Sequence, residues 1–263
     1  MIAEREPAEA DRRSGGPPVS GPVLFARYAF GPNRLGYCGP DADVELFELG
    51  AAPQPDDRGL RHLARGFDGA WLNLELIAEA NAIPDPLDRR VVEAYWLGNE
   101  LLDAVRPGAF ADSLAGRFRP RLRSEGWRWL AAKPAAGAVP VHAFHVLDVF
   151  PRVGLLRSGS TERIVETIDA CRIRWGRVLE RDGPFVVVNV VPLRLVAGRL
   201  AFGSPRPERV EAWRDGASFV AGVGLGDVIS VHWSFACDRL GPTQLDALIR
   251  WTSREIAIAN TTI

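Results

Sequence analysis

Two stretches decide the fold of the second half of this chain: Cys171-Arg-Ile-Arg-Trp-Gly-Arg-Val178 and Gly226-Asp-Val-Ile-Ser-Val-His-Trp-Ser-Phe-Ala-Cys-Asp-Arg-Leu240. The first opens a series of short segments rich in β-branched residues, and the second closes it. We expect strands over 173–180, 185–191, 199–202, 206–213 and 227–233. Asp182-Gly183 is a strong hairpin signal between the first two. Pro242 suits the first turn of a helix that runs to about Asn260, so the pattern predicts a small barrel-like module ended by a helix.

The first half of the chain has a helical pattern. Apolar residues recur at three- and four-residue steps from Leu60 to Ile77, and similar steps follow over 91–102 and 110–118. This spacing places them on one face of a helix. Asp88 follows a Pro-rich break and is suited to cap the second of these helices. The fold class predicted is therefore α+β.

A connector rich in Pro, Ala and Gly, Lys133 to Pro140, marks the boundary that we expect between the two halves. The residues before position 21 are charged and then rich in Gly, Pro and Ser, which favours disorder. The predicted organisation comprises a disordered tail (1–20), a helical domain (21–132), a connector with an apolar segment (133–160), and a strand-rich domain with its final helix (161–263).

Composition excludes several classes of function. The formal net charge of the 263-residue chain is -1, so no basic surface for nucleic acid or an anionic membrane is expected. No apolar run is long enough to span a bilayer, and the first residues lack the apolar core of a secretory signal. Three widely spaced cysteines without an export signal indicate reduced thiols. We therefore expect a cytoplasmic protein that binds neither nucleic acid nor membrane.

Cys171 and His232 are the main candidates for metal ligands, because thiolate and imidazole both bind iron or copper well. Arg172 and Arg174 flank the cysteine and are in a position to lower its pKa. The competing interpretation is structural. In that case Cys171 is a small buried residue at the start of a strand, and His232 is a half-exposed strand histidine.

His142 and His145 are additional candidates for metal ligands. They lie three residues apart in an apolar, strand-like segment, 141–151. A strand would send them to opposite faces, whereas a helical turn would bring them together. Cys38, in a Gly-rich turn, is either a metal or redox thiol or a packing residue, and Cys237 is expected in the core.

The strand region resembles the HypC/HupF family of [NiFe]-hydrogenase maturation chaperones. Cys171 falls at the cysteine position of that family and Gly176 at its glycine, although Trp175 stands where the family has proline. The closing motif matches in order, at Gly226, Asp227, Val231, His232, Phe235, Ala236 and Leu240. This resemblance covers about a third of the chain and implies a small five-stranded, OB-like barrel followed by a helix.

The resemblance also implies a function. It predicts an accessory protein, not an enzyme, that takes part in [NiFe]-hydrogenase maturation as a chaperone of the large subunit or in iron delivery. The cargo would be a transient iron carrying cyanide and carbonyl, and the partner a large-subunit precursor or another maturation factor. Cys171 would be the soft ligand and His232 a second one. Cys171 is internal here, whereas the family uses an N-terminal cysteine.

Two alternatives stay open. One is an enzyme with an interdomain pocket lined by the histidines and Cys171, and the other is a non-catalytic interaction module. The whole chain also resembles an uncharacterised family from actinobacteria, through the stretch Tyr28-Ala-Phe-Gly-Pro-Asn-Arg-Leu-Gly-Tyr-Cys-Gly39.

Overall fold

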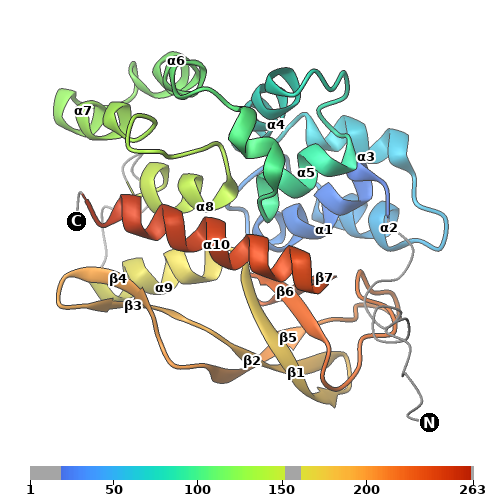
Figure 1. Cartoon of the computed structure of the whole chain (residues 1–263). Helices are drawn as coiled ribbons and strands as arrows, with labels where there is room; N and C mark the ends of the chain where they lie inside the picture. Colours follow the sequence, from blue (N-terminus) through green and yellow to red (C-terminus); the bar gives the residue numbers. More distant parts are fainter. Residues whose placement is uncertain (1–18, 152–160, 262–263) are drawn as a thin grey trace, which may run out of the picture.

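The computed structural model describes residues 19–151 and 161–261. It combines a helical N-terminal part with C-terminal strands and a final helix, as the sequence predicts (Figure 1). Most of the predicted tail and part of the connector lie outside the described residues. The first part contains α1 (Gly21–Arg34), α2 (Asp43–Ala51), α3 (Asp57–Ala64), α4 (Asp68–Ala80), α5 (Arg89–Trp96), η2 (Glu100–Ala104), α6 (Pro107–Phe118) and α7 (Ser124–Ala132).

Side-chain caps fix where several helices begin. Ser20 accepts a bond from the amide of Val23 at the start of α1. Asp56 accepts two amide bonds at the start of α3, and Asp88 accepts one from Arg90 at the start of α5. Each cap satisfies main-chain N–H groups that a helix leaves without partners at its first turn. The prediction of Asp88 as a cap is confirmed.

The strands form a sheet whose pairing order closes on itself. They are β1 (Arg174–Asp182), β2 (Phe185–Val190), β3 (Leu193–Val196), β4 (Arg199–Phe202), β5 (Arg206–Glu211), β6 (Val228–His232) and β7 (Phe235–Arg239). The closed order is β1-β2-β5-β7-β6, with β6 paired back to β1, while β3 and β4 form a separate hairpin. Asp182 pairs with Phe185 across the predicted hairpin turn, where Gly183 has φ 58°.

The segment expected to be strand-like, 141–151, is helical instead. It contains the short helix α8 (His142–Phe144) and the π-helical turn η3 (His145–Val149), in which the amide of Phe150 bonds the carbonyl of His145. Both are buried and pack against α10 (Pro242–Ala259), the predicted final helix. Burial explains the mostly apolar composition that made the segment look like a strand.

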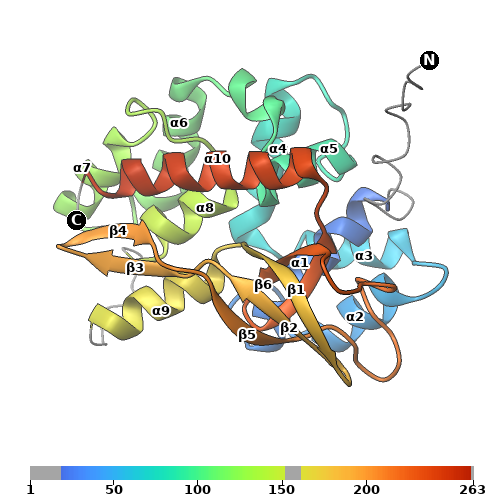
Figure 2. The same ribbon diagram turned by 60° about the horizontal axis from the view of Figure 1, so that its bottom comes forward.

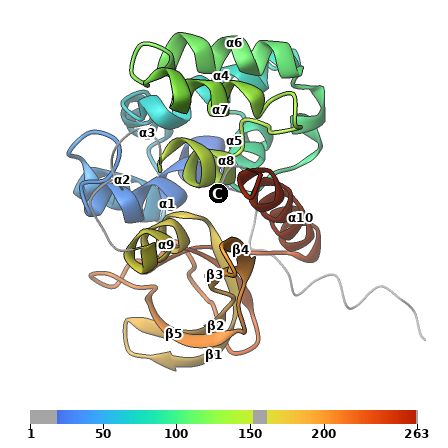
Figure 3. The same cartoon turned by 90° about the vertical axis from the view of Figure 1, so that its left-hand side faces the viewer.

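The two parts of the molecule meet along a seam. Figures 1 and 2 show α10 lying across the molecule between the helices and the strands, and Figure 3 shows α9 (Thr161–Cys171) at the same level. One continuous apolar core includes Phe30 of α1 together with Trp175 and Phe235 of the sheet. A smaller, separate core of Val, Ile and Ala side chains fills the closed sheet. In the described residues, no helix is long and apolar enough to cross a membrane.

Candidate metal centre

Three potential ligands converge at the seam. One ligand-type atom from each of His142, Cys171 and His232 lies within 4.8 Å of the other two, and all three residues are buried. They come from α8, the last residue of α9 and the last residue of β6. The prediction that Cys171 opens a strand is therefore wrong: it is the last residue of α9, and β1 begins at Arg174.

His232 presents a free lone pair. Its Nδ1 lies 2.6 Å from the carbonyl oxygen of Tyr28, so Nδ1–H is the donor and Nε2 carries the lone pair. Nε2 is buried and has no hydrogen-bond partner among the residues that the structure describes. A buried acceptor without a partner is uncommon because it loses its bonds to water. A metal ion is one group that would satisfy it.

His142 is held by two neighbours. Its Nε2 lies 2.9 Å from the carbonyl oxygen of Cys171, and its Nδ1 lies 3.4 Å from the hydroxyl of Tyr95. The centre of its ring is 5.0 Å from the ring of His232 and 4.7 Å from that of Trp96. The carbonyl of Cys171 thus positions the imidazole of His142, and its thiol lies close to both His142 and His232.

Both imidazoles are in the form that binds metals. Burial lowers the pKa of His142 to about 4, although the carbonyl of Cys171 opposes this effect. Burial also lowers the pKa of His232 well below its ordinary value, and the nearby His142 adds to the decrease. Neutral imidazole is the ligand form, so neither ring has to lose a proton at neutral pH to bind an ion.

The expectation that the flanking arginines lower the pKa of Cys171 is wrong. Burial raises the pKa of this thiol, which is therefore protonated when no ion is bound. Arg172 is itself buried and pairs with Asp169, and Arg174 pairs with Glu208. Both guanidinium groups thus face carboxylates instead of the thiol. Because burial keeps the thiol protonated, a bound cation would have to displace its proton.

The donor set fits a small transition-metal ion. A tetrahedral ion with bonds of about 2.0 Å to nitrogen and about 2.3 Å to sulfur holds its ligand atoms about 3.3–3.6 Å apart. The cluster has to contract slightly from its 4.8 Å limit to reach that spacing. One thiolate with two imidazoles favours iron, zinc or copper over magnesium or calcium, which prefer oxygen.

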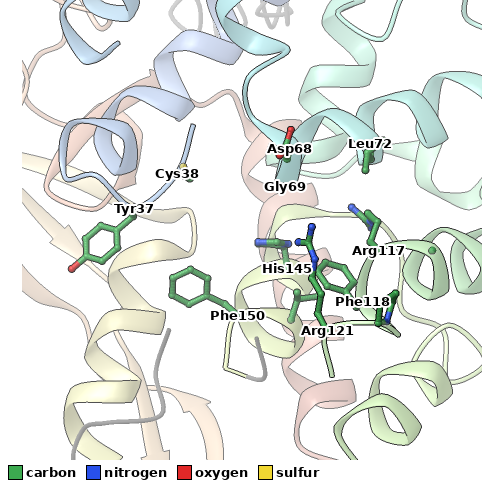
Figure 4. A pocket seen from close by; sticks show the side chains of 13 residues that line it. Tyr37, Cys38, Asp68, Gly69, Leu72, Arg117, Phe118, Arg121, His145 and Phe150 are labelled. Atoms are coloured by element: carbon green, nitrogen blue, oxygen red, sulfur yellow. The ribbon is translucent and has the colours of Figure 1, made fainter. Parts of the chain in front are cut away.

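His145 does not join this cluster. It stands three positions after His142, which turns its side chain by about 60° on a helical turn. It lines an open pocket together with Cys38, as Figure 4 shows. The sequence offered no signal for this pocket, because its walls come from segments far apart in the chain. Cys237 is fully buried in the core, as expected.

A stacked pair of aromatic rings lies next to His142, Cys171 and His232. Trp233 directly follows His232, and its amide bonds the carbonyl of Ala170 beside Cys171. The ring of Tyr37 stacks on Trp233 with centroids 4.3 Å apart and an interplanar angle of 10°. Tyr37 also lines the pocket that contains His145. The stacked pair therefore lies between the pocket and the end of β6.

Comparison with known proteins identifies the family of the chain. Residues 17–263 match the model of a family of unknown function, DUF6390, and the chain belongs to that family. No curated protein matches it, and no solved structure does.

Proposed function

We propose that this protein binds one transition-metal ion at His142, Cys171 and His232 and acts as an accessory protein in the assembly of a metalloenzyme. The observation that carries the proposal is the convergence of three buried ligands from three separate elements, with Nε2 of His232 lacking a partner. A buried acceptor without a hydrogen bond is costly unless another group satisfies it.

The most concrete case is maturation of a [NiFe]-hydrogenase, with iron as the cargo. The resemblance to the HypC/HupF family supports it through Cys171, Gly176 and the closing motif 226–240. We propose that the closed five-stranded sheet is OB-like, a description supported by its closed order and by α10 following it. The buried position of Cys171 argues for a fixed ligand rather than a mobile cysteine.

We further propose that the protein works in the cytoplasm and that its partner is a hydrogenase large-subunit precursor or another maturation factor. The helical part has no counterpart in the small chaperones and would supply additional surface for docking. The test is affinity capture from a native host that makes active hydrogenase. Recovery of a large-subunit precursor or maturation factor is expected, and recovery of neither would contradict this part of the proposal.

Metal binding is tested by titrating the metal-free protein anaerobically with Fe(II), and with Co(II) as a spectroscopic probe. We expect one ion per chain and a thiolate-to-cobalt absorption band, because Cys171 is the only thiol in the cluster. Cys171→Ala should abolish the band, and His142→Ala and His232→Ala should weaken binding strongly. Infrared spectra of protein purified with its partner should show cyanide and carbonyl stretches.

The chain supplies matched controls for these variants. Cys237→Ala removes a buried thiol outside the cluster, and His62→Ala removes an exposed imidazole. Both should bind the probe ions as the wild type does. If wild-type protein takes up neither iron nor cobalt, the metal proposal fails and the interaction-module interpretation replaces it. If it binds iron but never carries the diatomic ligands, only the hydrogenase part fails.

A second candidate function is an enzyme that uses the same Cys/His centre. The observation that favours it is the pocket beside the centre, since His145 and Cys38 on its wall interact electrostatically with His142 and Cys171. A clustered set of perturbed groups beside a pocket is typical of active sites. Turnover of a small molecule by the metal-loaded protein without any partner would favour the enzyme over the accessory protein.

A further inference from the structure

The pocket beside the metal centre has its own chemistry. It has a volume of about 620 Å³ and is bounded by the turn after α1, the start of α4, the end of α6 and η3. This volume is within the range that holds a small organic ligand. In Figure 4 the nitrogen ends of Arg117 and Arg121 and the imidazole of His145 point into the same space.

Arg117 is held with one donor nitrogen left over. Its Nη2 donates to the side chain of Asn73 at 3.0 Å, and its Nε donates to the carbonyl of Ser113 at 3.3 Å. Its Nη1 is buried and has no partner among the described residues. The two bonds fix the plane of the guanidinium, so the donors of Nη1 are already oriented for a ligand. Both acceptors are uncharged, so a guanidinium with one buried nitrogen still unpaired favours an anion.

The charge of the pocket points to the same class of ligand. Two guanidinium groups line it, against a single carboxylate, that of Asp68. In the part of the chain that the structure describes, no ion pair joins Asp68 to Arg117 or Arg121. Burial lowers the pKa of His145 to about 3, so its ring adds hydrogen-bonding capacity without charge.

The remaining wall of the pocket is apolar. Leu72, Phe118, Val149 and Phe150 contribute side chains to it. An inorganic ion would leave this surface in contact with water, whereas an organic body would cover it. The combination of fixed cationic donors and an apolar wall is the usual composition of a metabolite site.

We propose that this pocket binds a small organic anion, with its carboxylate or phosphate held by Arg117 and Arg121 and its apolar body against Phe118 and Phe150. Both head groups accept paired hydrogen bonds from guanidinium groups, which is the chemistry they share. The proposal does not depend on whether the neighbouring centre holds a metal, and it goes beyond the proposed function.

The test is calorimetric titration of the full-length, metal-free protein with three probes of similar size: phenyl phosphate, phenylacetate and benzyl alcohol. We expect at least one of the two anions to bind, and the uncharged alcohol to bind at least ~10-fold more weakly, because it lacks the charge-assisted bonds. The order of the two anions identifies the preferred head group.

Arg121→Gln is the decisive variant, because Arg121 is an exposed side chain on the pocket wall and its replacement should leave the fold intact. We expect it to weaken anion binding by ~10-fold or more, since a hydrogen bond to a charged group is lost. Arg117→Gln should weaken binding at least as much, with folding checked by circular dichroism because its bond to Asn73 is structural. Arg119→Gln, exposed and outside the pocket, is the matched control and should leave binding unchanged.

Three results would overturn the proposal. One is that neither anion binds at millimolar concentration. Another is that benzyl alcohol binds as tightly as the anions, which would mean an apolar cavity only. The last is that Arg119→Gln weakens binding as much as Arg121→Gln does, which would mean a general effect of charge on the surface.

Discussion

Two buried polar clusters lie where the helical part meets the strands and α10. One consists of uncharged donors, and the other contains an ion pair. The ligand cluster, His142, Cys171 and His232, contains donors that are all uncharged when no ion is bound. The charge cluster, Lys133, Asp148 and Glu255, joins the end of α7 to η3 and α10. Both are fully shielded from water.

The charge cluster compensates itself within the protein. Nζ of Lys133 lies 2.9 Å from a carboxylate oxygen of Asp148 and donates to the carbonyl of Ile258 at 2.7 Å. Glu255 accepts a bond from the amide of Val139 at 3.3 Å. In the ligand cluster Nε2 of His232 has no partner among the described residues, as Oε2 of Glu255 has none in the charge cluster, but the three ligand residues include no ion pair. Burial, a shifted pKa and an unpartnered atom therefore occur in both clusters, and the ligand cluster is distinguished by its set of soft nitrogen and sulfur donors.

The largest effect is expected from removing the cation of the charge cluster. Lys133→Met should lower the free energy of unfolding by about 3–5 kcal/mol, because it leaves the buried carboxylate of Asp148 without this counterion. Urea denaturation measures the change, with exposed Arg128→Ala as the control. Metal uptake should be unchanged in both variants. A Lys133→Met protein as stable as the wild type would show that the pair contributes nothing net.

The charge cluster should also make stability depend on pH. Burial raises the pKa of Glu255 to about 8, whereas the unfolded chain has the ordinary value near 4.5. Between these values the folded state keeps a proton that the unfolded state has lost, so the free energy of unfolding falls as pH rises. Its contribution is complete below pH 4.5 and is lost by pH 8, with a slope of at most about 1.4 kcal/mol per pH unit. Glu255→Gln should flatten that slope in urea titrations between pH 5 and 8, and an unchanged slope would assign it to other groups.

The ligand cluster should respond to metal rather than to pH. A metal ion at 100 times its dissociation constant should raise the free energy of unfolding by about 2.7 kcal/mol, because it binds only the folded state. Cys171→Ala should cost the metal-free protein about 1 kcal/mol and remove the increase on adding metal. Melting curves with and without Co(II) measure both. Cys237→Ala, equally buried, should keep the increase, and its loss there would show that the effect is not local to the cluster.

An effect on stability as small as that of Cys171→Ala is expected at the stacked pair of Tyr37 and Trp233. Tyr37→Ala removes a ring that is 44% exposed and stacks on Trp233, so it should cost about 1 kcal/mol. It should also speed the removal of a bound ion by a chelator, because only Trp233 of the two stacked rings then remains at the end of β6. Tyr37→Phe keeps the stack and is the control. Equal chelation rates in all three proteins would mean that ions reach the cluster by another route.

Local sequence signals predicted much of the secondary structure. Three- and four-residue periodicity indicated the helical character of the first half, although the run from Leu60 to Ile77 is divided into α3 and α4 by a break at 65–67. Asp88 marked where α5 begins. Asp182-Gly183 fixed the β1–β2 hairpin, and Pro242 fixed the start of α10. These signals succeed because they depend on a few neighbouring residues, whose backbone preferences act over one turn or one hairpin.

The remaining elements escaped sequence analysis. The strands β3 and β7 are short and lack a clear alternation, and 141–151 has the mostly apolar composition that a buried helix and a buried strand share. Cys171 was placed at a strand start because a series of short, strand-like segments follows it, yet α9 continues to it. Such boundaries are set by packing at the seam and not by local preference.

The sequence by itself determined the types of chemistry available: a thiol and an imidazole, Cys171 and His232, at positions that the resemblance singles out, and two further candidate imidazoles, His142 and His145. Only the tertiary structure decided that His142 meets Cys171 and His232, that His145 faces a separate pocket, and that Arg117 and Arg121 line the same space. The physical reason is that these residues are far apart in the sequence. Residues 142, 171 and 232 lie on different elements, and their distances depend on how α8, α9 and β6 pack across one shared core. No spacing along the chain encodes that packing.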